Sequence, residues 1–259
     1  MKEITTDELH AILIDIAKEF HKICKQNSIP YYMLGGTMLG AIRHKGFIPW
    51  DDDMDFGVPR EHFRRLADIM KTHLPQNMNV LDLHNSNLYT DVLKIEMANT
   101  KIEEDGMTDK GINIDVFPLD YTNNRRDVLS LNYWIYLSVK YNCYAYSPHP
   151  YKGIGGILQH IFSFFHPIKK KTFPCWIEKM SISKKNTYTS YANHFGYWNL
   201  REIVDKNYFG KPTLYEFEDI KLYGVAEYDK YLTSLYGSYM ELPPLEKRHI
   251  HIAKVWVED

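Results

Sequence analysis

The sequence predicts an α+β fold with an α/β-type core, in which helices flank a mixed sheet and the C-terminal part is mostly helical. Apolar residues recur at helical spacing over residues 5–28, which indicates an amphipathic helix. Short apolar segments of strand length follow at 31–34, 53–58 and 112–117. Beyond residue 120 the segments become long, aromatic and helix-like. The pattern therefore predicts an α/β first half and a helical second half.

The first helix has a defined start and end. Thr5 followed by Glu8 forms a capping-box pattern, and Asn27, Ser28 and Pro30 stop the helix. The other elements expected before residue 120 are a strand at 31–34, a short helix at 37–43, a strand at 53–58, a helix at 60–74, hairpin strands at 78–84 and 89–97, and a strand at 112–117.

The second half is expected to contain more helix than strand. The expected elements are helices at 125–147, 151–165 and 173–193, short strands within 205–224, and a helix at 228–236 ended by Gly237. We divide the chain into residues 1–120 and 121–259 and expect the two regions to form one compact unit.

Composition excludes some classes of protein. A chain of 259 residues can bury a core without disulfides or a structural metal, and its net charge of -2 argues against a general nucleic-acid binder. The three cysteines lie far apart, and the N-terminal residues lack the apolar segment of a signal peptide. We therefore expect a cytoplasmic protein without a nucleic-acid partner.

The aspartates of the segment DDDMD (51–55) are candidate metal ligands. Alternate residues of a strand face the same side, so Asp53 and Asp55 project together while Met54 and Phe56 face the core. Two carboxylates so close repel each other unless a cation neutralises them, and oxygen ligands suit Mg²⁺ or Mn²⁺. Asp51 shares their parity and could assist, whereas Asp52 faces the other side.

Two other interpretations of these aspartates are weaker. A calcium loop starting at Asp51 would need Gly and Glu where Phe56 and His62 stand. A solvated acidic turn does not fit the apolar residues that flank the cluster.

A glycine pair precedes the aspartates. Gly35, Gly36 and Thr37 follow a strand and open a helix, where backbone N–H groups can approach a phosphate. A Gly-Gly pair often makes only a turn, and this segment is neither a P-loop nor a Rossmann fingerprint. Arg43 and Lys45 come next; either they neutralise a diphosphate or they form an exposed helix end.

Asp115, in the strand INIDVF (112–117), is a third candidate. An aspartate within an apolar strand is costly to bury unless it is ion-paired or binds a metal, and both interpretations remain open. Asp120 is expected to be a turn residue after Pro118.

Taken in order, these motifs resemble the nucleotidyltransferase superfamily. More narrowly, GGTMLGAIRHKGFIPWDDDMDFGVPR (35–60) resembles the LicD family, which includes phosphocholine transferases and fukutin-type ribitol-phosphate transferases. Segments 111–120, 217–232 and 232–248 resemble later blocks of that family. One departure is Ser238, which stands where the family usually has Asp, so no metal or acceptor role is assigned to it.

The resemblance implies roles for matching positions. Residues 1–120 would form a nucleotidyltransferase-like catalytic core, and 121–259 would complete the substrate pocket. The implied catalytic and metal-binding residues are Asp53, Asp55 and Asp115, with Mg²⁺ or Mn²⁺ as cofactor. The implied phosphate- and donor-binding residues are Gly35, Gly36, Thr37, Arg43 and Lys45.

The function implied by the resemblance is phospho-alcohol transfer. The enzyme would move phosphocholine or a similar group from a CDP-alcohol, such as CDP-choline, to a hydroxyl of a lipopolysaccharide, teichoic acid or capsule glycan, or its lipid-linked precursor, and release CMP. A second hypothesis is a nucleotidyltransferase that moves NMP from an NTP. A third is an inactive binding module on the same fold.

Residues 153–171 (GIGGILQHIFSFFHPIKKK) join an apolar segment to three lysines. Such a segment is most often a core-facing helix with a solvated lysine end. The alternative is a helix that lies on an anionic membrane and gives weak peripheral contact at its inner face.

Overall fold

The computed structural model describes residues 1–86, 91–104, 107–122, 153–165, 188–193, 199–248 and 254–258, with single positions 141, 169, 172 and 175. The strands are β1 Lys2–Glu3, β2 Tyr32–Met33, β3 Asp55–Pro59, β4 Met78–Leu81, β5 Leu93–Met97, β6 Thr100–Glu104, β7 Met107–Lys110, β8 Asn113–Thr122, β9 Ser190–Ala192, β10 Ile203–Asp205, β11 Thr213–Phe217, β12 Ile220–Gly224 and β13 Lys254–Val257. The helices are α1 Thr6–Gln26, α2 Gly35–Arg43, α3 Arg60–His73, α5 Ile154–Phe165, α7 Lys206–Phe209 and α8 Tyr228–Tyr236, with short 3-10 helices η4 Asn199–Glu202 and η5 Leu245–Lys247.

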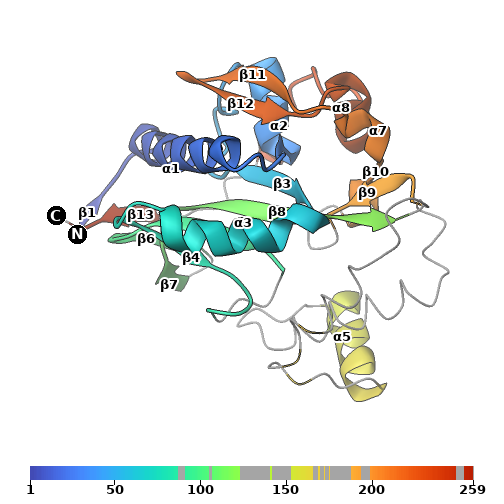
Figure 1. The fold of residues 1–259 in the computed structure, drawn as a ribbon, viewed down its shortest axis with the longest axis horizontal. Coiled ribbons are helices and arrows are strands. Elements are labelled where there is room, and N and C mark those ends of the chain that lie inside the picture. The colour runs from blue at the N-terminus through green and yellow to red at the C-terminus, as the bar shows by residue number, and fades with distance from the viewer. Residues whose placement is uncertain are drawn as a thin grey trace.

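A mixed seven-stranded sheet forms the centre of the molecule (Figure 1). Its main order is β10-β9-β8-β3-β2, and β5 pairs with β8 on one side and with β4 on the other. β3 and β8 run parallel, whereas the other pairs in this sheet are antiparallel. A four-stranded sheet β1-β13-β6-β7 and the hairpin β11-β12 complete the described strands.

The two faces of β3 and β8 have different roles. Phe56 of β3 is fully buried and packs against Phe20 of α1, at a ring-centroid distance of 4.8 Å. Val116 lies beside Phe56 in the register, so it shares that apolar face. Side chains alternate along a strand, so Asp55 and Asp115 face the opposite side. The packing of α1 against the sheet therefore determines which face carries the carboxylates.

Most elements predicted for the first half are confirmed. The capping box at Thr5 and Glu8 is present at the start of α1, and the predicted hairpin forms as β4 and β5. The last helix ends at Gly237, whose φ of 69° fits glycine. The mixed sheet flanked by helices is as predicted.

The second half differs from the prediction. Among the described residues beyond 120 there are five strands, so the mostly helical C-terminal part is not confirmed. Residues 190–192 form β9, where a helix was predicted. They pair with β8, which is distant in sequence, so the local pattern could not reveal this strand. β13 was not predicted either, and it pairs with β1 and β6. The helix predicted at 125–147 lies almost wholly outside the described residues, and the division at residue 120 stays a prediction.

Asp120 is not a turn residue. It lies on β8, is buried, and accepts two hydrogen bonds from Arg60, with Nε–Oδ1 2.7 Å and Nη2–Oδ2 2.9 Å. Arg60 also pairs with the buried Asp91 at 2.6 Å. Although burial alone would lower the pKa of Arg60, the two carboxylates raise it. Arg60 therefore ties the start of α3 to the strand that carries Asp115.

We predict that Arg60→Met destabilises the protein by about 3–5 kcal/mol at neutral pH, because it leaves two buried carboxylates without their cation. The measurement is urea unfolding. Arg64→Met on the same helix is the control: its side chain is half exposed and pairs with Asp68 one turn away, and its other partner, the buried Asp82, keeps Lys71 at 2.6 Å. The loss should therefore stay below about 1 kcal/mol. Equal losses in the two variants would contradict the assignment.

Candidate active site

Asp55 and Asp115 lie side by side on the sheet. They are direct partners in the parallel β3–β8 register, and the Asp115 N–H donates to the carbonyl of Met54 at 2.9 Å. Neighbouring strands are about 4.8 Å apart, so the two carboxylates share one small volume. The structure thus brings together two of the three predicted catalytic aspartates.

Asp115 is also ion-paired. Its neighbour in the antiparallel register with β5 is Lys94, whose Nζ lies 2.5 Å from Oδ1. Asn113 Nδ2 donates to the same oxygen at 2.6 Å. Both bonds use Oδ1, so a cation or an acceptor hydroxyl would meet Oδ2. The ion-paired interpretation of Asp115 is confirmed, and it remains compatible with the metal-binding one.

The loop before β3 adds further carboxylates. Asp51, Asp52 and Asp53 each offer a carboxylate oxygen such that these atoms lie within 4.8 Å of one another. Asp52 is buried, Asp53 is exposed, and Asp51 is intermediate. His10 of α1 fixes this loop, since Nε2 donates to the Asp51 carbonyl at 2.8 Å and its ring stacks on Phe47. Asp53 therefore reaches the site from a loop, not from the strand that the sequence predicted.

The start of α2 lies against these carboxylates. A Cβ added to Gly36 would lie 2.7 Å from Asp51 Oδ2, and one added to Gly35 would lie 3.8 Å from Asp55 Oδ2. The buried Thr37 hydroxyl accepts the N–H of Asp55 at 2.8 Å. A helix N-terminus stabilises negative charge, so α2 supports the aspartates. The phosphate-binding role of Gly35, Gly36 and Thr37 stays a prediction.

Helix α8 and η4 supply residues that sequence reasoning missed. The Tyr231 hydroxyl accepts the Gly35 N–H at 3.1 Å, and a Cβ on Gly35 would lie 3.6 Å from the Tyr236 hydroxyl. The pKa of Tyr236 is raised, first by burial and then by electrostatic interaction with Tyr231, Asp55, Asp51 and Glu202. Only the resemblance of segments 217–232 and 232–248 to family blocks pointed to this region. Burial raises the pKa of Tyr231 as well, so both Tyr231 and Tyr236 are protonated at neutral pH.

Crowding of negative charge is the main electrostatic property of the site. The pKa of Asp55 is raised well above its ordinary value. Burial is the largest cause, followed by the charges of Asp53, Asp115, Asp51 and Glu202. Carboxylates gathered in this way are a hard oxygen donor set, which fits Mg²⁺ or Mn²⁺. The residues present therefore suit a divalent cation.

The two basic residues lie further along α2. Arg43 Nη1 donates to the carbonyl of Tyr239 at 2.8 Å, and its Nε donates to His44 Nε2. Burial lowers the pKa of Arg43, while Asp51 and Tyr236 act in the opposite direction. Arg43 thus lies within electrostatic range of the site and fixes the chain after α8. Lys45 is exposed two residues beyond the far end of α2, a helix whose nine residues span about 13 Å. Donor contacts by either residue stay predictions.

We predict that Gly36→Ala weakens Mn²⁺ binding about 10-fold or more, because the new methyl group displaces the Asp51 carboxylate. Stability should change by less than about 1 kcal/mol, since a carboxylate can rotate away and alanine favours helix. The measurement is calorimetric Mn²⁺ titration. The control Gly153→Ala should show the reverse: unchanged Mn²⁺ affinity but a loss of about 1–2 kcal/mol, because its φ is 62° and its surroundings are open. Unchanged Mn²⁺ affinity in Gly36→Ala would refute this placement of Asp51.

We predict that Asp55→Asn stabilises the metal-free protein at neutral pH. Because the pKa of Asp55 is raised in the folded state, the contribution of this residue to stability is fully present below its ordinary pKa. That contribution is lost as the pH rises from the ordinary pKa through the folded-state pKa. The difference from Asn should therefore shrink as pH falls below about 4. Wild type should also gain about 2.7 kcal/mol at Mn²⁺ near 100 Kd, and Asp55→Asn should gain far less.

Thermal unfolding in EDTA and in Mn²⁺ measures both effects. Asp219→Asn is the control, because Asp219 is exposed on the loop between β11 and β12 and forms an ion pair with Lys18 on the surface. A destabilised, metal-responsive Asp55→Asn protein would show that the carboxylates neither repel one another nor bind the ion.

Comparisons with known proteins found a family domain and curated relatives. Residues 28–148 match the family model described as LicD/FKTN/FKRP, nucleotidyltransferase domain. A curated relative, the lipopolysaccharide cholinephosphotransferase LicD of Haemophilus influenzae, is 27% identical over 97% of this chain and 97% of its own. An uncharacterised protein of Rickettsia typhi is 42% identical over 62 residues, which cover 23% of this chain and 20% of its own.

Among solved structures, terminal uridylyl transferase 4 from Trypanosoma brucei with bound GTP matches 50% of this chain and 40% of its own, at 16% identity and a TM-score of 0.25. That score is too low to support an argument. The family resemblance seen in the sequence is confirmed by the first two matches: residues 28–148 are similar to the nucleotidyltransferase domain of the LicD family, and a LicD protein aligns with nearly the whole chain.

Proposed function

We propose that this protein is a metal-dependent transferase that moves phosphocholine, or a similar phospho-alcohol, from a CDP-alcohol to a hydroxyl of a cell-surface glycan and releases CMP. The single observation that carries the proposal is the alignment with the Haemophilus influenzae lipopolysaccharide cholinephosphotransferase, which runs over 97% of both chains. The aspartates gathered at β3 and β8 support it, because they lie inside the matched family domain.

The acidic residues would hold the cation and position the donor diphosphate. Asp53, Asp55 and Asp115 would bind Mg²⁺ or Mn²⁺, and Asp51 would assist from the loop. When bound, the ion would neutralise charge on the phosphate oxygens. Lys94 and Asn113 hold Asp115 in one orientation through Oδ1. This leaves Asp115 Oδ2 either to share the cation or to take the proton of the acceptor hydroxyl.

The transfer itself is a displacement at phosphorus. The acceptor oxygen would bond to the phosphorus next to the alcohol, and the bond from that phosphorus to the bridging oxygen would break. CMP would leave with the electron pair, and the hydroxyl proton would pass to a base such as Asp115. Positioning and electrostatics supply most of the rate in reactions of this type. Arg43 and the start of α2 would stabilise the negative charge of the diphosphate.

A nucleotidyltransferase that moves NMP from an NTP is the other candidate, and the family description of the domain favours considering it. The products separate the two reactions, since an NTP would yield pyrophosphate and a CDP-alcohol would yield CMP.

We predict CMP release from CDP-choline, CDP-ethanolamine, CDP-ribitol or CDP-glycerol in the presence of Mg²⁺ or Mn²⁺ and a lipopolysaccharide acceptor. Asp53→Asn, Asp55→Asn and Asp115→Asn should each lower the rate by about 10³-fold or more, because several kcal/mol of charge stabilisation are lost. Asp219→Asn should retain the wild-type rate, as its carboxylate lies on an exposed loop.

Chromatography of the nucleotide products measures this. Pyrophosphate in place of CMP would replace the proposal with the nucleotidyltransferase reaction. Absence of both products, together with Mn²⁺ affinity that Asp53→Asn leaves unchanged, would indicate a binding module.

A further inference from the structure

Helix α5 carries its apolar side chains on the outside. The exposed fractions are 79% for Phe164, 78% for Phe165, 61% for Ile157 and 45% for Ile161. These positions are spaced i, i+4, i+7 and i+8, so they form one stripe along the helix. The polar Gln159, in contrast, is only 5% exposed. The helix is therefore reversed relative to the core-facing helix that this sequence pattern usually predicts.

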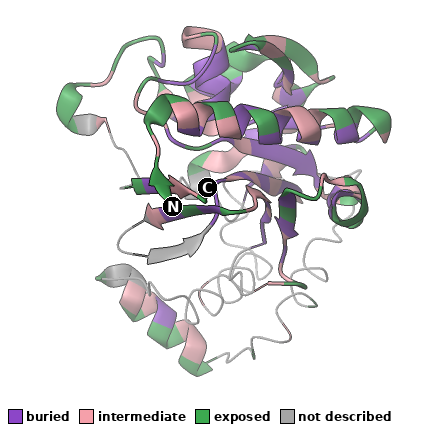
Figure 2. Cartoon of the chain, turned by 90° about the vertical axis from the view of Figure 1, so that its left-hand side faces the viewer, coloured by how far each residue is buried: buried purple, intermediate pink, exposed green. Residues whose placement is uncertain are grey.

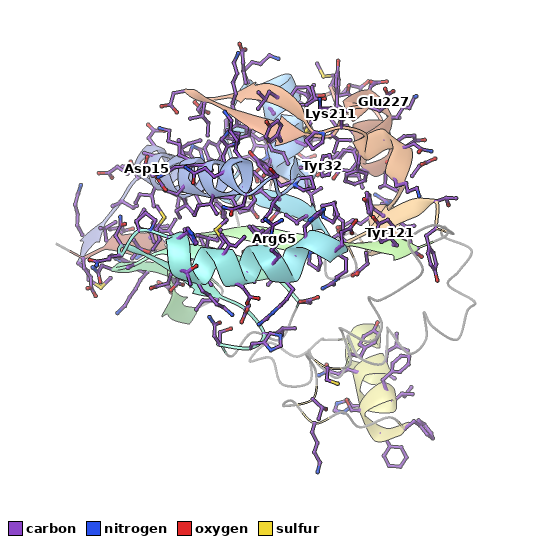
Figure 3. All side chains as sticks on the ribbon, viewed as in Figure 1. Asp15, Tyr32, Arg65, Tyr121, Lys211 and Glu227 are labelled. Carbon is purple, nitrogen blue, oxygen red and sulfur yellow. The ribbon has the colours of Figure 1, made fainter. Side chains whose placement is uncertain are left out.

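The position of α5 agrees with this reversal. It lies apart from the sheets, at one end of the molecule (Figure 1). Figure 2 shows α5 mostly in the colours of exposed and intermediate residues, whereas the sheet is largely buried. In Figure 3 side chains extend from α5 on sides that face no other described element. Phe162, off the stripe, stacks on Tyr141 with parallel rings 5.3 Å apart. The described contacts thus anchor one side of α5 and leave the stripe outside.

The sequence on either side of α5 carries charge of one sign. Between Asp127 and Glu178 the sequence contains no acidic residue, although the whole chain has 33 of them and a net charge of -2. The lysines within this interval are Lys140, Lys152, Lys169, Lys170 and Lys171. Lys169 is exposed and follows α5 by four residues. An exposed apolar stripe beside cations is complementary to an anionic bilayer, whose headgroups attract lysine and whose interior accepts phenylalanine.

Other occupants fit less well. The stripe offers on the order of 500 Å² of apolar surface, while a stable dimer needs about 800 Å² from each partner. A helix of 12 residues is about 18 Å long, too short for a hydrocarbon core of about 30 Å. In agreement, no helix within the described part of the chain has the length and apolarity to cross a membrane.

We propose that the α5 stripe, formed by Ile157, Ile161, Phe164 and Phe165, is a membrane-docking surface that lies flat in the headgroup region of an anionic bilayer, with Lys169 beside the headgroup phosphates. Docking of this kind would bring the enzyme to an acceptor glycan carried on a lipid, which is where the inference meets the proposed function. The binding itself does not depend on which group is transferred.

The test is flotation of the full chain with vesicles of phosphatidylcholine alone or mixed in equal parts with phosphatidylglycerol. Wild type should bind only the anionic vesicles, and binding should weaken from about 0.1 M to 1 M salt as the screening length falls from about 10 to 3 Å. Phe164→Ser/Phe165→Ser should lower the affinity at least about 10-fold, because two apolar side chains lose their burial. Lys169→Glu should also weaken binding to the anionic vesicles, because it places a negative charge beside the headgroup phosphates.

The control is Leu214→Ser, which removes an apolar side chain of 48% exposure from β11 and should not change vesicle binding. Circular dichroism should show that the stripe variants remain folded, since none of their side chains is buried. Equal flotation of the double variant and wild type would overturn the proposal. So would wild-type dimers that the double variant converts to monomers while neither binds vesicles, because the occupant would then be a second copy.

The two proposals fail separately. Asp53→Asn should lose CMP release and keep vesicle binding. Phe164→Ser/Phe165→Ser should keep the rate of CMP release with a detergent-solubilised acceptor and lose rate only when the acceptor is embedded in anionic vesicles. A loss of rate in both settings would contradict the docking role, whereas CMP release that is absent from wild type would count against the proposed function alone.

Discussion

The parallel pairing of β3 with β8 is the constraint on which the site depends. It sets Asp55 beside Asp115 and, through the antiparallel partner β5, places Lys94 next in the row. The apolar face of the same strands packs on α1, so the hydrophobic core and the carboxylates lie on opposite faces of the same two strands. A one-residue change of register would exchange the two faces. The acidic site is thus as well determined as the core beneath it.

The surrounding elements hold charges that would otherwise separate. Thr37 fixes the backbone of Asp55, His10 fixes that of Asp51, and Arg60 connects α3 to β8 through Asp120. α8 closes the site from the other end of the chain, because Tyr231 bonds to the first residue of α2. Repulsion among the carboxylates is therefore opposed by hydrogen bonds from four separate elements, and a cation would convert that repulsion into binding free energy.

Sequence reasoning predicted the parts that depend on local pattern. The period of 3.6 and the capping box located α1, and the alternation around Met54 and Phe56 separated core from carboxylate. The candidate aspartates and the family were likewise predictable, because their motifs are contiguous. Tyr236, Glu202 and the partners of Asp120 were not, since they meet the site through contacts across long stretches of sequence. For α5 the pattern located the apolar stripe but could not tell which way it faces, because periodicity is the same for a helix turned inward or outward.

The β3–β8 register also bears on how this sequence can diverge. The chain between the two strands forms α3, β4, β5, β6 and β7. The loops that join these elements can lengthen or shorten at little cost in free energy. Within β8 itself a single inserted or deleted residue would turn Asp115 toward α1 and bury its charge in the core. Descendants of this gene can therefore vary freely in loop length, while the alternation of side chains along β8 stays fixed.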